Sequence, residues 1–158
     1  DGHIFVLETA HTTYCFWRME TGHLEHLYYG RHLTLPEHPA ERDVAPLMEK
    51  HTFAPGNTNL CDGEHPAFSL EDMRLEMSSY GKGDIREPFV EIVHADGSTT
   101  SDFRYESYEI TEKTAETENG DLPGAYDEKG ETQRLSVRLR DHSYDLVLEL
   151  HYDGKTQQ

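Results

Sequence analysis

Two segments near the end of the chain alternate between apolar and polar residues, and this pattern constrains the fold more than any other feature. In 133–140 (QRLSVRLR) three aliphatic residues occupy alternate positions, with Ser and Arg between them. The segment 144–152 (YDLVLELHY) alternates in a similar way. A period of two gives a strand one apolar face, as in an antiparallel sheet that is covered on one side. The two segments therefore predict a hairpin that turns at 141–143.

The rest of the sequence holds further strand patterns. β-Branched and aromatic residues are frequent in the N-terminal third, and short turns interrupt them. We expect three strands there, at 3–10, 12–19 and 23–30. A second hairpin is expected further along, with arms at 88–94 and 99–110 around the turn ADGS. The apolar parity of its second arm changes after Tyr105, which predicts a bulge near 106–107.

The middle of the chain differs from these strand patterns. Five prolines fall between residues 31 and 66, and the sequence there has no periodicity. We expect a long irregular excursion, and such loops in compact domains are often functional or contact partners. A short helix is expected at 69–77, with Ser69 as its N-cap, and an acidic connection at 111–131.

Several short alternating strands joined by turns predict an all-β fold, an antiparallel β-sandwich. A chain of 158 residues is long enough for one domain with its own core, and no repeat or internal linker divides it. We therefore expect a single domain over residues 1–158.

The balance of charge limits the partners of the chain. Its net charge is -17 with neutral histidines, and such a surface repels phosphate backbones and anionic lipids. Nucleic acid and membranes are therefore not expected partners, and no apolar run approaches the roughly 20 residues of a membrane-spanning helix. The two cysteines, Cys15 and Cys61, are too few for a disulfide framework. Free thiols fit a reducing compartment, so we expect a cytoplasmic protein.

The stretch SSYGKGDIREPFVEI (78–92) raises the question of a phosphate loop or a pair of catalytic acids. Its glycines lack the spacing and the Gly-Lys-Ser/Thr ending of a P-loop. In an extended segment Asp84 and Glu87 point to opposite sides, and Pro88 favours an extended Glu87. The favoured interpretation is a glycine-hinged corner of a sheet, where Asp84 and Arg86 fix the turn or dock a neighbour. A small stand-alone enzyme that uses Asp84 and Glu87 is the less favoured alternative.

Metal and nucleophile motifs are missing from the sequence. Eleven histidines are scattered along it, without a His-Glu-x-x-His motif or the Cys/His spacing of a zinc site. A Gly-x-Ser-x-Gly elbow is absent, and neither cysteine has basic neighbours that would activate it. We therefore expect no metal site and no self-contained catalytic constellation. Some aromatic side chains near polar loops could stack on a sugar, although most are expected in the core: Trp17, Tyr28, Tyr29, Phe53, Tyr80 and Tyr126.

Three ordered blocks of the sequence carry a resemblance to a known family. The first, 4–33, contains Gly-x-Leu-x-His-Leu-Tyr-Tyr-Gly. The second, 68–110, contains Phe-Ser-Leu, then Tyr-Gly-x-Gly-Asp-Ile-Arg-Glu-Pro, then Asp-Gly-Ser-x-x-Ser-Asp-Phe-Arg-Tyr. The third, 122–141, begins with Leu-Pro-x-x-Tyr and ends in an alternating strand. In these blocks the chain resembles the N-terminal region of bacterial α-galactosidases of glycoside hydrolase family 36.

The resemblance implies a β-supersandwich of the galactose-mutarotase-like type, which precedes a (β/α)8 barrel in such enzymes. That barrel carries two catalytic aspartates and hydrolyses terminal α-galactosides, such as melibiose and raffinose, with retention and without a metal or organic cofactor. The Lys-Trp-Asp motif of the nucleophile is absent from this sequence. Residues 1–158 are therefore expected to be the N-terminal domain of a longer enzyme, inactive alone, whose partners are its own barrel, neighbouring subunits and a galactoside substrate.

The resemblance also suggests where sugar and barrel would be contacted. Some family members are tetramers in which a loop of this domain offers an acidic residue, and an Arg before Phe-Ser-Leu, to a neighbour's active site. Here His65, Pro66 and Ala67 precede Phe68, so the Arg is not matched. Within 49–65 the substrate-binding candidates are Phe53, Glu64 and His65, and the interdomain candidates at the corner are Asp84, Arg86 and Glu87. An autonomous carbohydrate-binding module is the alternative, and it would bind free galactosides without a barrel.

Overall fold

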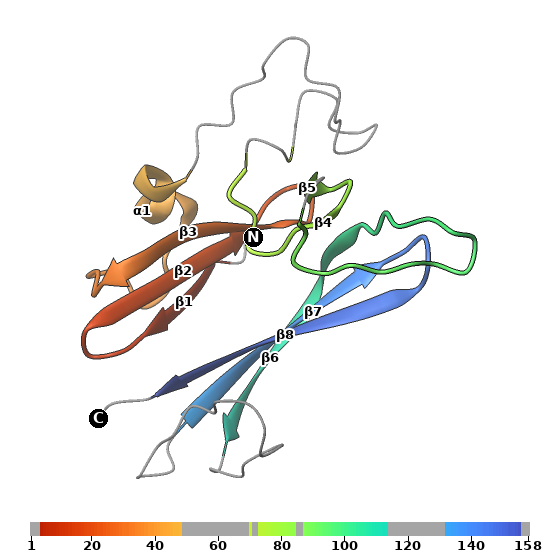
Figure 1. The fold of residues 1–158 in the computed structure, drawn as a ribbon. Coiled ribbons are helices and arrows are strands. Elements are labelled where there is room, and N and C mark those ends of the chain that lie inside the picture. The colour runs from red at the N-terminus through yellow and green to blue at the C-terminus, as the bar shows by residue number, and fades with distance from the viewer. Residues whose placement is uncertain (1–3, 49–69, 71–72, 85–86, 114–131, 156–158) are drawn as a thin grey trace.

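The computed structural model describes residues 4–48, 70, 73–84, 87–113 and 132–155. Within these ranges the chain forms two antiparallel three-stranded sheets (Figure 1). The first sheet contains β1 (Ile4–Glu8), β2 (Thr12–Arg18) and β3 (Leu24–Arg31) in that order. The second contains β6 (Phe103–Lys113), β7 (Thr132–Asp141) and β8 (Leu146–Lys155) in that order. The mostly-β, antiparallel architecture predicted from the alternating segments is confirmed.

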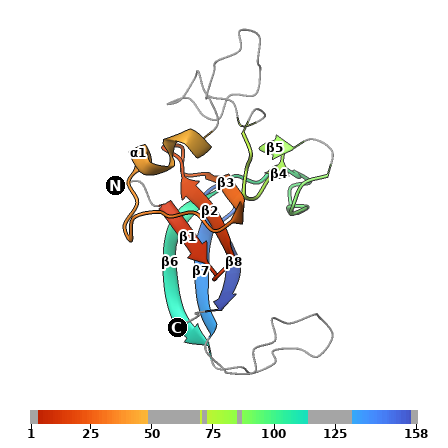
Figure 2. The ribbon, with the colours of Figure 1, turned by 90° about the vertical axis from the view of Figure 1, so that its left-hand side faces the viewer.

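The two sheets lie face to face and enclose the main core. Figure 2 shows the first sheet over the second, with β1 on the same side as β6 and β3 on the same side as β8. The rings of Phe5 and Phe16 stack with centroids 4.8 Å apart, and Tyr152 of β8 stacks on Phe16 at 4.9 Å. The buried residues of this core are Phe5, Phe16, Leu24, Met77, Phe103, Leu135, Val137 and Leu139. Burial of this apolar layer is the main stabilising contribution that the sequence pattern encodes.

The first sheet is also covered on its other face. Cys15, Trp17 and Leu27 belong to a second buried cluster, which includes Val44 of the short helix α1 (Glu41–Val44). A 3-10 helix, η1 (Ala45–Leu47), continues α1. These two helical turns lie inside the proline-rich excursion, where the sequence predicted only irregular structure. In the described part of the chain, no helix is long and apolar enough to cross a membrane.

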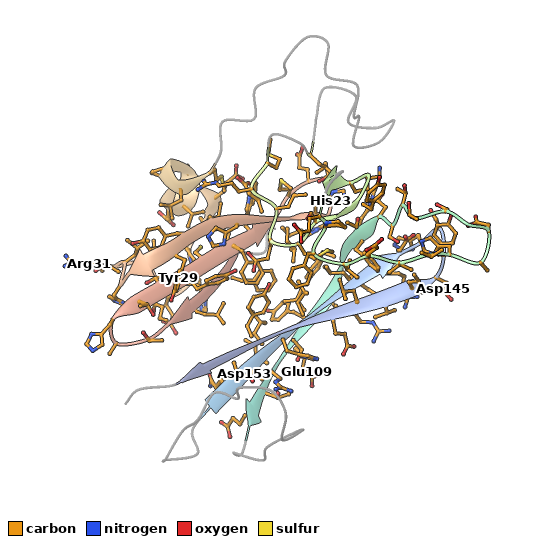
Figure 3. The ribbon with its side chains drawn as sticks, viewed as in Figure 1. His23, Tyr29, Arg31, Glu109, Asp145 and Asp153 are labelled. Atoms are coloured by element: carbon orange, nitrogen blue, oxygen red, sulfur yellow. The ribbon has the colours of Figure 1, made fainter. Side chains whose placement is uncertain are left out.

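The second sheet follows the sequence pattern closely. β7 and β8 pair from one end to the other, and the turn between them contains Asp145 with a positive φ of 51°. The register of β6 against β7 shifts between Tyr105 and Ser107, so the predicted bulge is confirmed. Figure 3 shows Glu109 and Asp153 on the side of this sheet that faces away from the first. That outer face is polar, whereas the inner face is apolar.

The expected hairpin of 88–94 with 99–110 is wrong in its first arm. Within 88–94 a single residue, Val90, makes a bridge, and its partner is Ser79 rather than β6. β6 pairs with β7 instead, because the alternating segment 132–141 offers a much longer complementary partner. Val90 and Ile92 still pack against the core. The alternation therefore predicted the inward face of 88–94 correctly, but not its pairing.

The helix expected at 69–77 is wrong over 73–77, whereas Leu70, the other described residue of this range, has a 3-10 helical conformation. The backbone of 73–77 runs beside β3, where the N–H of His26 donates to the carbonyl of Arg74 at 2.7 Å. The N–H of Glu76 donates to the carbonyl of Leu24 at 2.9 Å. Pairing with a sheet edge satisfies these backbone groups and overrides the weak local preference for a helix.

Candidate functional site

The residues singled out from the sequence fall into two groups. The substrate-binding candidates lie outside the residues that the structure describes: Phe53, Glu64 and His65. Sugar contact by this loop therefore stays a prediction. Among the interdomain candidates, Arg86 also lies outside the described residues, whereas the backbone of Asp84 belongs to a short strand and Glu87 is exposed just beyond it. The structure thus places Asp84 and Glu87 at one corner of the fold.

This corner is a tight turn between β4 (Ser79–Tyr80) and β5 (Gly83–Asp84). Gly81 between them has a φ of +77°, a region that other residues rarely adopt. A Cβ at Gly81 would also lie 3.0 Å from Oγ1 of Thr100, so a side chain here would be strained in conformation and would crowd Thr100. The hydroxyl of Ser79 donates to the backbone carbonyl of Ser101. The corner is therefore fastened to the segment that leads into β6.

Exposed apolar side chains lie on the corner and on the segment 87–93 that follows it. Phe89 is 68% exposed and Val93 is 71% exposed, and Tyr80 is exposed as well. Glu87 and Glu91 are exposed on the same segment. Isolated apolar side chains on a surface are ordinary, but several on one short, anchored segment are typical of a contact surface.

Beside the corner, the carboxylate of Asp102 gathers three basic side chains. Nε2 of His23 lies 2.7 Å from Oδ1, and Arg104 donates to Oδ2 from Nε at 3.1 Å and from Nη2 at 2.9 Å. Nζ of Lys82 lies 3.9 Å from Oδ2. Figure 3 shows His23 where the first sheet approaches the corner. We call these four residues the Asp102 hub; it joins the start of β3, the corner and β6.

The protonation of Asp102 follows from a competition between two effects. Burial by itself would raise the pKa of Asp102, because desolvation disfavours the charged form. The hydrogen bond and charge of His23, followed by Arg104 and Lys82, outweigh burial and lower the pKa to about 2. Asp102 therefore carries a negative charge at neutral pH, opposite its basic neighbours in the hub.

A hydroxyl completes the hub in a way that superficially resembles a nucleophilic triad. Oγ1 of Thr21 lies 3.0 Å from Nδ1 of His23, whose other ring nitrogen faces Asp102. Thr21 is only 3% exposed, so a substrate cannot reach its hydroxyl. The arrangement braces the fold and is not a catalytic centre.

A second set of polar contacts, partly buried, fixes the turn at 94–98. Nε2 of His94 lies 2.9 Å from Oγ of Ser101, and its ring stacks on Tyr144 with centroids 3.4 Å apart. The hydroxyl of Tyr144 donates to Oδ2 of Asp96 at 3.1 Å. The 94–98 turn is thereby anchored to the turn between β7 and β8.

Asp141 connects this second set to the Asp102 hub. It is 1% exposed, and Oδ2 accepts the backbone N–H of Asp102 at 2.9 Å. Its Oδ1 accepts the N–H of Ser143 at 2.8 Å. Buried carboxylates that accept several N–H groups fix the surrounding backbone. Residues from all three blocks of the family pattern, among them His23, Asp102 and Asp141, therefore build a polar frame around the corner.

A separate carboxylate, Glu76, clasps the two sheets together. Oε1 of Glu76 accepts hydrogen bonds from the hydroxyls of Tyr14 in β2 and Tyr152 in β8, the latter at 2.8 Å. Oε2 lies 3.2 Å from Nδ1 of His26. Burial, together with the hydrogen bond and negative charge of Glu76, raises the pKa of both tyrosines. Both hydroxyls therefore remain donors across the neutral range.

Sequence reasoning missed these groups because their partners are remote along the chain. His23 and Asp102 are 79 residues apart, and Glu76 and Tyr152 are 76 apart. Local spacing carries no signal for contacts of that length. As for metals, the described residues contain no group of three or more His, Cys, Asp or Glu side chains that could hold an ion.

The described residues form a mostly β domain with two stacked antiparallel sheets and a polar frame around the corner. The chain belongs to the family described as Glycosyl hydrolase family 36 N-terminal domain, which it matches over residues 22–157.

Relatives of the chain come from bacteria and fungi. It is 30% identical over 149 residues to the bifunctional alpha-galactosidase/sucrose kinase AgaSK of Mediterraneibacter gnavus, covering 94% of this chain and 15% of that protein. It is 28% identical over 155 residues to the probable alpha-galactosidase G of Aspergillus terreus, covering 96% of this chain and 18% of that protein. The family membership expected from the sequence is confirmed, but it does not establish a bacterial source.

Solved structures share the fold. The alpha-galactosidase from Lactobacillus brevis matches with a TM-score of 0.75 and 28% identity, over 95% of this chain and 19% of that one. An AgaA variant from Geobacillus stearothermophilus in complex with raffinose matches with a TM-score of 0.76 and 25% identity, over 97% of this chain and 20% of that one. The chain thus spans a fifth or less of the length of these proteins.

Proposed function

We propose that this chain is the N-terminal structural and assembly domain of a longer α-galactosidase, which we call the parent enzyme. The observation that carries the proposal is the family match over 22–157 in a chain that spans a fifth or less of its relatives. The parent enzyme would hydrolyse terminal α-galactosides such as melibiose and raffinose with retention. The raffinose complex of the similar AgaA variant supports this substrate class. The finer supersandwich class of the fold belongs to the same proposal.

In this proposal the catalytic groups lie in a barrel outside residues 1–158. Retaining hydrolysis needs two carboxyl groups about 5–5.5 Å apart across the scissile bond. The carboxylates of Glu76, Asp102 and Asp141 are instead each engaged by donors of the protein itself. Carboxylates that already accept hydrogen bonds from the protein stabilise its fold, and in this proposal other residues transfer the protons.

The exposed corner is the surface that would contact the catalytic barrel. Its apolar side chains Phe89 and Val93 are available for burial, and the Asp102 hub holds the corner in place. Participation of Asp84, Arg86 and Glu87 in that contact stays a prediction. Cytoplasmic localisation and an oligomeric parent enzyme are likewise predictions from the sequence and its resemblance.

The first test is calorimetric titration of this chain with raffinose and with galactose, using the parent enzyme as the positive control. We expect no saturable heat from the chain up to millimolar sugar, because its sugar contacts require the barrel. Saturable binding would contradict a purely structural role and would favour the carbohydrate-binding module. Phe53→Ala, in the loop 49–65, would then be the first variant to titrate.

A further inference from the structure

One arginine between the two sheets lacks a counter-ion. Arg18 ends β2 and is partly buried. In the part of the chain that the structure describes, its side chain forms no ion pair and no hydrogen bond. Its Nε atom is buried, and no other buried nitrogen or oxygen atom in the side chains of the described buried and half-buried residues lacks a hydrogen-bond partner. Buried donors without an acceptor are rare in folded proteins, so this one requires an explanation.

The aromatic neighbour of Arg18 does not supply the missing acceptor. The guanidinium carbon lies 5.5 Å from the centre of the Tyr105 ring in β6. Such a cation–π contact is attractive, but the face of a ring does not replace the hydrogen bond that a buried N–H group needs. An arginine also keeps its charge in a protein, so it cannot become neutral by losing a proton. The chain alone therefore holds a charged group that is only partly compensated.

Three acidic residues are the obvious internal candidates for a counter-ion, and none of them pairs with Arg18. Oε2 of Glu25 accepts the Nε1–H group of Trp17 at 2.5 Å. The carboxylate of Asp102, just before β6, is engaged by the hub. Glu20 is exposed in the turn after β2 and forms no ion pair with Arg18. The counter-ion is therefore to be sought elsewhere.

We propose that Arg18 binds a carboxylate of the parent enzyme from outside residues 1–158, and that this ion pair fixes the domain against the rest of the enzyme. The planar guanidinium group matches a carboxylate through two parallel hydrogen bonds. The terminal nitrogens of Arg18 also lack partners and are not buried, so an incoming carboxylate can reach them. A turn of the long side chain would then bring Nε into the same pair. The inference rests on the proposed function, which makes the chain part of a longer protein.

A carboxylate of the parent enzyme fits this site better than a second copy of the chain or a free anion. The chain spans a fifth or less of the length of its relatives, so most of the parent enzyme lies outside residues 1–158 in the proposal. Second copies and free anions are both repelled by a net charge of -17. A tethered segment has an effective concentration of about millimolar, which outweighs this repulsion.

Zero-length cross-linking of an Arg18→Lys parent enzyme identifies the partner. A carbodiimide joins an amine to a carboxylate that it contacts, and mass spectrometry then identifies the joined peptides. We expect the lysine introduced at position 18 to be joined to an Asp or Glu from outside residues 1–158. Arg134→Lys is the positive control and should be joined to Asp153, because Nε of Arg134 lies 2.7 Å from Oδ1 of Asp153. A link from position 18 to a residue within 1–158, or no link while the control forms its own, would overturn the inference.

A pair of methionine variants gives an independent test. Arg18→Met removes the charge and the buried Nε–H group but keeps a long side chain, so the Tm of the chain alone should stay unchanged or rise. In the parent enzyme it would leave the partner carboxylate unpaired. The first unfolding transition should then fall by at least about 4 °C more than in Arg31→Met, a variant of the exposed arginine labelled in Figure 3. Equal shifts in the parent enzyme, or an equal loss from Arg18→Met in the chain alone, would contradict the ion pair.

The activity of the parent enzyme on raffinose is measured separately. A link from position 18 to a residue outside 1–158, without that activity, would refute the proposed function and support the ion pair. Activity without such a link would refute the ion pair and support the function.

Discussion

Asp102 accepts hydrogen bonds from His23 and Arg104, and its side chain is 20% exposed. Asp102→Asn leaves the basic groups of the hub without their counter-charge in a partly buried site. We expect the free energy of unfolding at pH 7 to fall by about 2–3 kcal/mol, measured by urea denaturation. The control is Asp153→Asn on the outer face of the second sheet, where loss of the pair with Arg134 should cost less than about 1 kcal/mol. Equal losses in the two variants would argue against a central role for the hub.

The same residue predicts a dependence on acid. An unfolded aspartate has a pKa of about 3.9, whereas folding lowers the pKa of Asp102 to about 2. A depressed folded pKa stabilises the protein above the unfolded value, and this contribution disappears as the pH falls through the folded value. The difference in stability between wild type and Asp102→Asn should therefore narrow from about pH 4 down to about pH 2. A difference that stays constant over this range would contradict the assignment.

Tyr152 predicts the opposite dependence. Its folded pKa is raised by burial and by Glu76, so its contribution is complete below the unfolded value of about 10 and declines above it. Tyr152→Phe should cost about 1–2 kcal/mol at pH 7, because Glu76 loses a donor. The difference from wild type, followed by urea denaturation, should shrink as the pH rises beyond about 10. The exposed Tyr29 supplies the control, since Tyr29→Phe should change neither the stability at pH 7 nor its dependence on pH.

At the scale of elements, two glycine-to-alanine variants should lower the stability by different amounts. Gly81 and Gly97 both have a positive φ, so alanine is strained at either position. A Cβ at Gly97 meets open space, whereas one at Gly81 lies 3.0 Å from Thr100. Gly97→Ala should cost about 1 kcal/mol and Gly81→Ala at least about 1 kcal/mol more, measured by thermal unfolding. Similar losses would show that Thr100 moves aside easily.

The elements that the sequence predicted well are those whose patterns are local. β7 and β8 bury alternate residues on one face, so their period of two survives in the sequence. The arm 88–94 has a similar alternation, but its backbone lies against Ser78 and Ser79, which no local rule identifies. The helical turn α1 was missed because Val44 supplies its single buried residue, too little for a periodic signal.

The candidate site was predictable only in part. The glycine-hinged corner expected at 78–92 agrees with the positive φ of Gly81 in the turn between β4 and β5. Asp102 and His23, the paired acid and base of the Asp102 hub, were not singled out from the sequence, because only the tertiary fold brings them together. Physical reasoning on the sequence could identify polar residues in the motif, but not which of them would be buried and paired.

At the scale of the whole molecule, the exposed corner predicts different outcomes in the chain and in the parent enzyme. Phe89 is 68% exposed, so Phe89→Ser should change the stability of this chain by no more than about 0.5 kcal/mol. In the parent enzyme the same change should lower the Tm and the activity on raffinose, because it would remove the proposed contact with the barrel. Val147→Ser, an exposed position on the second sheet, is the control and should be neutral in both. If Phe89→Ser leaves the Tm and the activity of the parent enzyme unchanged, the corner is not part of the contact with the barrel.

The two sheets differ in how many of their faces are covered, and this asymmetry has a consequence for the freedom of the sequence to change. In β7, polar residues occupy every second position and meet solvent, so a library of variants should accept almost any hydrophilic residue there. In β2, the consecutive residues Cys15, Phe16 and Trp17 are all buried, between the main core on one face and the cluster beneath α1 on the other. A saturation library should therefore show tolerance with a period of two along β7, and an unbroken block of intolerance at the centre of β2.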